Sequence, residues 1–130
     1  ITLTIGEAAT CTITNNDISP TLKVVKTIVS NNGGTEADPN AFDLRIDGVG
    51  VLHNAINTVD AGNHTVSEVG VAGYIPGTWG GDCNPDGTIT LAVGENATCT
   101  ITNDDTDATS LTLRKQVIND NGGTAVASKL

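Results

Sequence analysis

The sequence predicts an all-β fold: a small two-sheet sandwich of immunoglobulin-like or transthyretin-like type, arranged in tandem repeats. The chain contains short runs rich in Thr, Val and Ile, and within each run apolar and polar residues alternate, as in half-buried strands. Turn sequences such as Asn-Gly-Gly and Asp-Gly separate these runs, and no stretch of twelve residues holds a helical period. One segment also recurs almost unchanged later in the chain.

The alternating runs are short and closely spaced. About seven of them fall within a stretch of about 90 residues, which is typical of a two-sheet sandwich. The expected strands are 22–29, 42–47, 64–69, 88–93 and 98–103, with weaker candidates at 49–57 and 73–79.

The composition limits both the core and the partners. The 130 residues include one Phe, one Trp, one Tyr and no Met, so the core must be thin and built mainly of β-branched side chains. Six basic against fifteen acidic residues give a net charge of −9, which disfavours nucleic acid and anionic membranes as partners. No apolar run approaches the roughly 20 residues that span a bilayer, so we expect no membrane insertion in this segment.

The chain repeats itself. Residues 1–17 and 89–105 are identical at 13 of 17 positions, an offset of 88, and residues 21–35 return in altered form at 110–124. We therefore divide the chain into the closing hairpin of a preceding repeat (1–17), one complete repeat (21–105) and the opening strand of the next repeat (110–130). The partial units belong to a longer array or are completed by neighbouring chains; the sequence leaves both open.

Strand phase places three polar side chains on buried faces. Lys26 is in phase with the apolar residues of its strand, Asn103 continues the phase of Cys99 and Ile101, and Glu68 shares a face with Val66. The repeat equivalents of the first two and of Cys99 are Lys115, Asn15 and Cys11. Each polar group is costly to bury alone, so we expect Lys26, Glu68 and Asn103 to meet.

These residues carry a family resemblance. Its motifs are Leu22-x-Val24-x-Lys26, Glu68 followed by Gly73-Tyr74, and the terminal Ile101-Thr102-Asn103. They resemble the B-type repeats of collagen adhesins and the SpaA-type repeats of Gram-positive pilins, within the broader group of prealbumin-like surface-protein repeats. The resemblance covers the whole unit. It implies an intramolecular isopeptide bond between Lys26 and Asn103, promoted by Glu68.

The residues fit that chemistry, and they also fit a simpler arrangement. Burial favours the neutral amine of Lys26, a nucleophile, and a protonated Glu68 that can hydrogen-bond the carboxamide and shuttle protons as ammonia leaves. Such a reaction happens once per molecule and is maturation, not turnover. The alternative is a buried Lys26–Glu68 salt bridge beside a hydrogen-bonded Asn103.

The cysteines predict one disulfide within the complete repeat. Cys83 and Cys99 lie sixteen positions apart, and Cys11 is the counterpart of Cys99 in the preceding repeat. A disulfide indicates an oxidising compartment, so we expect an extracellular or cell-surface protein. No CxxC motif or paired His accompanies these cysteines, and we expect no metal at them.

Two further kinds of site follow from short motifs. Asn63-His64-Thr65 and Asn96-Ala97-Thr98 are candidate N-glycosylation sequons. The acidic connector 103–107 and its counterpart 15–17 offer the oxygen ligands that Ca²⁺ prefers, although such segments are commonly just solvated. No other cofactor is indicated.

These observations favour a mechanical function. We expect a structural tandem repeat of an extracellular filament, stalk or adhesin shaft, whose partners are neighbouring repeats or copies of the same protein. The alternative is an adhesin module that recognises a host protein or glycan through its loops. We do not expect an enzyme, because neither His53 nor His64 lies beside a Ser or Cys in a catalytic order.

Overall fold

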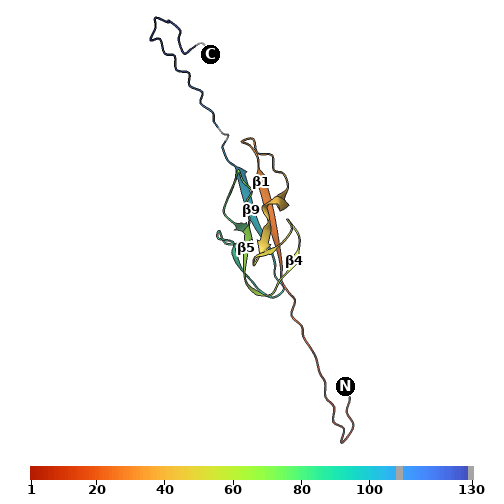
Figure 1. Ribbon diagram of the computed structural model, residues 1–130. Coiled ribbons are helices and arrows are strands. Elements are labelled where there is room, and N and C mark those ends of the chain that lie inside the picture. Colours follow the sequence, from red (N-terminus) through yellow and green to blue (C-terminus); the bar gives the residue numbers. More distant parts are fainter. Residues whose placement is uncertain (108–109, 129–130) are drawn as a thin grey trace.

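The computed structural model describes residues 1–107 and 110–128, and it contains one β-sandwich. The sandwich lies between the two ends of the chain, which project from its opposite ends (Figure 1). Residues 1–19 form no strand and are exposed, and no strand is present in 110–128. Their assignment to incomplete repeats stays a prediction, since neither segment has the rest of its own unit beside it.

The first sheet is built around a parallel pair of the first and last strands. Parallel strands need a long crossover, and here the crossover supplies the second sheet. In the first sheet the order is β4 (Asn57–Thr58), β1 (Thr21–Val29), β9 (Asn96–Asp105) and β6 (Tyr74–Pro76), with β7 (Gly80–Gly81) also paired to β9.

The second sheet is antiparallel throughout. Its order is β3 (Val49–Gly50), β2 (Leu44–Ile46), β5 (Gly62–Glu68) and β8 (Thr88–Leu91). The all-β, two-sheet prediction is therefore confirmed, and each of the five main strand candidates overlaps a strand.

The structure departs from the predicted bounds where side chains cap a turn. The candidate 42–47 begins late because a 3₁₀ helix, η1 (Pro39–Phe42), occupies its start; Asp38 caps this helix by accepting from the N–H of Asn40. The candidate 88–93 ends at Leu91 because the N–H of Ala92 donates to the carboxylate of Glu95 and closes a turn. The weak candidate 49–57 has strand only at its start, β3, and at its last residue, where β4 begins.

The core is a single layer between the two sheets. Phe42 is its largest side chain and is fully buried. The other buried apolar residues are Leu22, Val24, Leu44, Ile46, Val66, Ile89, Leu91, Ala97 and Ile101, together with Cys83 and Cys99. Within the described parts of the chain, no helix has the length and apolar character needed to cross a bilayer.

Candidate functional site

The two central strands carry a lysine and an asparagine into the core. Lys26 on β1 is 3% exposed and Asn103 on β9 is 0% exposed. They do not face each other directly, because Lys26 pairs with Ile101 and Asn103 with Ile28. The offset of two residues corresponds to about 6.6 Å along the strands, a distance that a lysine side chain can span.

Glu68 joins the two side chains from the opposite sheet. It is the last residue of β5, and its side chain is 7% exposed. One carboxylate oxygen, Oε2, pairs with the Lys26 ammonium, and the other, Oε1, accepts a hydrogen bond from Asn103 Nδ2 at 2.6 Å. The structure therefore brings together the three inward polar residues expected from strand phase.

The remaining surroundings of the lysine are apolar. Its Nζ lies 4.1 Å from the centre of the Phe42 ring, and the edge of Tyr74 meets that ring at 5.6 Å between centroids. Burial lowers the pKa of Lys26, and the hydrogen bond and charge of Glu68 oppose this shift only in part. Among the described residues, the buried Oδ1 of Asn103 has no hydrogen-bond partner. This oxygen is where charge develops if a nucleophile attacks the carboxamide carbon.

A histidine supports the backbone of the lysine strand. β4 pairs only with the first two residues of β1, and further along the N–H of Lys26 donates to His53 Nδ1 at 3.0 Å. The N–H of His53 in turn donates to the side chain of Asn40. No local sequence pattern indicates the bond between Lys26 and His53, because it joins residues 27 positions apart.

Sequence reasoning also missed a buried carboxylate at the end of β9. Asp105 is 6% exposed and accepts hydrogen bonds from the backbone N–H groups of Asn31, Asn32 and Gly34. Burial raises the pKa of Asp105, but these bonds together outweigh it, so its pKa lies below the ordinary value. The signal was present: the inward phase of Cys99, Ile101 and Asn103 continues to position 105.

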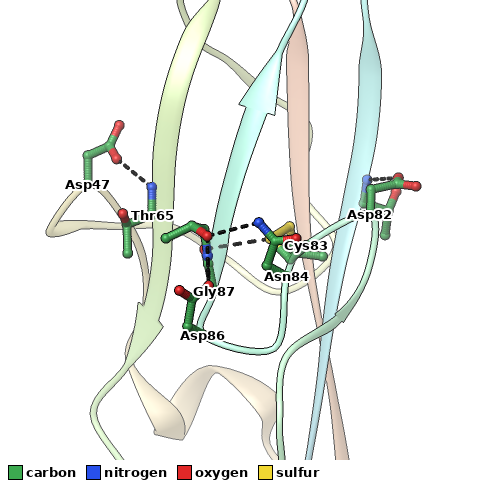
Figure 2. The surroundings of a disulfide bond; sticks show 10 residues. Asp47, Thr65, Asp82, Cys83, Asn84, Asp86 and Gly87 are labelled. Carbon is green, nitrogen blue, oxygen red and sulfur yellow. Dashed lines mark hydrogen bonds between the residues drawn. A yellow bond between two sulfur atoms is a disulfide. The ribbon is translucent and has the colours of Figure 1, made fainter.

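The predicted disulfide is present. Cys83 and Cys99 are bonded, with their Cα atoms 5.0 Å apart. Figure 2 shows Cys83 in the turn that precedes β8, where Asn84 and Gly87 surround it. Cys99 lies on β9, and the N–H of the preceding Thr98 donates to Asp82 at 2.7 Å. The bond thus joins the central strand of one sheet to the turn that leads into the other.

The other predicted site residues lie on the surface. Asn63 and Asn96 are both exposed, and each accepts a hydrogen bond from a threonine hydroxyl, of Thr90 and Thr21 respectively. Glycosylation at either one stays a prediction. The repeat equivalents Cys11, Asn15 and Lys115 are exposed and lie outside the sandwich.

Calcium binding at the connectors also stays a prediction. Two residues of the connector 103–107, Asn103 and Asp105, are buried in the sandwich, so their side-chain oxygens do not face the connector's surface. Within residues 1–107 and 110–128, no group of three or more His, Cys, Asp or Glu side chains is placed to hold a metal ion.

The comparison with protein families agrees with this architecture. The SpaA_2 model, described as a prealbumin-like fold domain, matches residues 17–101. The match includes Lys26 and Glu68 and ends two residues before Asn103. No curated protein and no solved structure matches the chain significantly. The resemblance to SpaA-type repeats is thereby confirmed, and the chain belongs to the SpaA_2 family of prealbumin-like fold domains.

Proposed function

We propose that this chain supplies tension-resisting repeats of an extracellular filament, stalk or adhesin shaft, each closed by an amide bond between Lys26 and Asn103. The observation that carries the proposal is the contact of both side chains with the two oxygens of one buried carboxylate, Glu68. Membership of a pilin-type family supports it. The Cys83–Cys99 disulfide supports an oxidising, extracellular setting.

The cross-link requires no outside reagent. The lone pair of the neutral Lys26 Nζ attacks Cγ of Asn103, the C–Nδ2 bond breaks, and Nδ2 leaves as ammonia. Glu68 contacts both nitrogens, so it can take the proton that Nζ loses and give one to the leaving Nδ2, ending in its starting state. Because the product is part of the protein, the role of the domain is structural and not enzymatic.

The positions of the two residues give the bond a mechanical purpose. The chain enters β1 at Thr21 and leaves β9 at Asp105, and these points face opposite ends of the molecule (Figure 1). Tension along the chain would otherwise pull β1 and β9 past each other and load the hydrogen bonds between them. A Lys26–Asn103 amide transmits the force directly and removes residues 27–102 from its path.

The array itself follows from the internal repeat. Because residues 1–17 and 110–124 repeat parts of the complete unit, its neighbours along the fibre are further copies of the same unit. Each unit has a thin core around one Phe, and covalent links compensate for a core of this size.

Intact mass measurement of the chain tests the proposal. We expect a mass about 17 Da below theory for the loss of one ammonia, in addition to about 2 Da for the disulfide. Lys26→Ala should abolish the ammonia loss and Glu68→Gln should strongly reduce it. Lys23→Ala is the matched control, because Lys23 lies on the same strand and faces the other way. A parent chain whose mass is only about 2 Da below theory would refute the cross-link. Lys26 and Glu68 would then form an ion pair and nothing more.

A further inference from the structure

The cross-link depends on the register between β1 and β9, and the apolar pattern of these strands does not fix that register. A slip of one residue would turn the buried faces outward and is excluded by the core. A slip of two residues keeps every face, because buried positions alternate along both β1 and β9. It would nevertheless move Asn103 by about 6.6 Å relative to Lys26.

The far end of the strand pair holds a group that distinguishes these registers. The last paired residues are Val29 and Asp104, and Asp105 follows immediately. Its carboxylate accepts the N–H of Asn31 at 2.9 Å, of Asn32 at 2.9 Å and of Gly34 at 2.6 Å, all in the turn that follows β1. The side chain of Asn32 also donates to the carbonyl oxygen of Asp105 at 3.2 Å.

The turn fits around the carboxylate too closely to allow another register. At Gly34, a Cβ atom would lie 2.8 Å from a carboxylate oxygen of Asp105 and would also meet the hydroxyl of Tyr74. That hydroxyl accepts from the N–H of Glu36 at 3.0 Å and shares a hydrogen bond with Ser30. The Gly73-Tyr74 element therefore closes the turn from its other side.

We infer that Asp105 is a positioning residue for the proposed cross-link: by binding the turn after β1, it fixes β9 in the register that brings Asn103 within reach of Lys26. The inference rests on the proposed amide bond. Both halves of the contact recur in the sequence, since Asp17 is the repeat equivalent of Asp105 and Asn121-Gly122-Gly123 is that of Asn32-Gly33-Gly34.

The test follows the rate of the cross-link from a defined start. Chains made by total chemical synthesis begin unfolded and unlinked, and amide formation starts when they refold in oxidising buffer. The variants are Asp105→Asn, which keeps the shape but loses the charge, and Asp104→Asn, its neighbour on the outer face of β9. Circular dichroism and the 2 Da loss of the disulfide report folding, and the 17 Da loss reports the amide.

We expect the parent and Asp104→Asn to form the amide at the same rate. Asp105→Asn should fold, form its disulfide and form the amide at least about tenfold more slowly, since a misplacement near 1 Å can cost about 100-fold in rate. Equal rates in a folded Asp105→Asn would overturn the role of Asp105 and leave the cross-link standing. No ammonia loss in the parent would overturn both.

A milder variant covers the case in which Asp105→Asn does not fold. Asn32→Ala keeps the backbone N–H groups and removes only the side-chain bond to the Asp105 carbonyl. Asn32→Ala should form the amide more slowly than the parent. If Asp105→Asn folds, the rate of Asn32→Ala should lie between the rates of the parent and Asp105→Asn. A rate equal to the parent's would count against the inference.

Discussion

Residues 1–17 and 89–105 have nearly the same sequence and very different surroundings. In the second copy, Cys99, Ile101 and Asn103 are almost completely buried. In the first, the equivalent Cys11, Ile13 and Asn15 are exposed and belong to no strand. The second copy has β1 beside β9 and β5 beside β8, and the first copy has neither neighbour.

The difference shows that this hairpin takes its structure from its neighbours. An isolated two-stranded hairpin is at best marginally stable, because it cannot bury its apolar face. The first copy is therefore a built-in control: the same substitution at equivalent positions should matter in 89–105 and have little effect in 1–17.

The largest expected difference is at the cysteines. Removing the Cys83–Cys99 bond should lower the free energy of unfolding by about 3 kcal/mol, since it closes a loop of 16 residues. The two variants to compare are Cys11→Ala and Cys11→Ala/Cys99→Ala, of which only the second lacks the disulfide. Cys11 is replaced in both so that it cannot pair with Cys83 when Cys99 is absent. Denaturant unfolding should show Cys11→Ala within about 0.5 kcal/mol of the parent. No further loss on adding Cys99→Ala would mean that the Cys83–Cys99 bond does not stabilise the fold.

A smaller difference between the two copies should appear at Asp105 and its repeat equivalent Asp17, in how stability changes as the pH is lowered. The folded-state pKa of Asp105 is depressed, so its contribution to stability is present above its unfolded pKa and is lost as pH falls through the folded value. Melting temperatures of the parent and Asp105→Asn should therefore differ at about pH 6 and converge towards about pH 2. Asp17→Asn should match the parent throughout. A gap for Asp105→Asn that does not narrow in acid would contradict the charge-based account.

The smallest expected effect concerns β5, the strand that pairs with β8. His64, opposite Ile89, bonds through Nδ1 to Asp47, and this bond raises the pKa of His64 with help from the Asp60 carbonyl. A raised pKa contributes stability below the unfolded value, and the contribution is lost as pH rises through the folded value. Asp47→Asn should thus destabilise the fold more at about pH 5.5 than at about pH 9, by less than about 1 kcal/mol. Equal losses at both pH values would show that His64 stays neutral in its contact.

Alternation alone predicted the main strands and the inward positions of Lys26 and Asn103, because a buried face imposes a period of two on the sequence. Glu68 was predicted in the same way from Val66. What alternation could not predict were contacts between segments far apart in sequence. The bond from Lys26 to His53 and the contact of Asp105 with the turn after β1 depend on how loops return to the sheet.

Local capping chemistry explains the late start of one predicted strand. The pair Asp38-Pro39 starts a 3₁₀ helix that displaces the start of a predicted strand, and Pro fits the first position of such a helix. Phe42, the last residue of this helix, lies over the amine of Lys26.

The pairing of β1 with β9 also sets the order of events when the chain is made. Thr21 pairs with Asn96 and Val29 with Asp104, so the centre of the first sheet consists of contacts between residues about 75 positions apart. During synthesis, the sheet cannot close until the ten residues of β9 have been added to the chain. Lys26 and Asn103 therefore meet only after β9 has joined the sheet, so the proposed amide can form only in a completely folded unit.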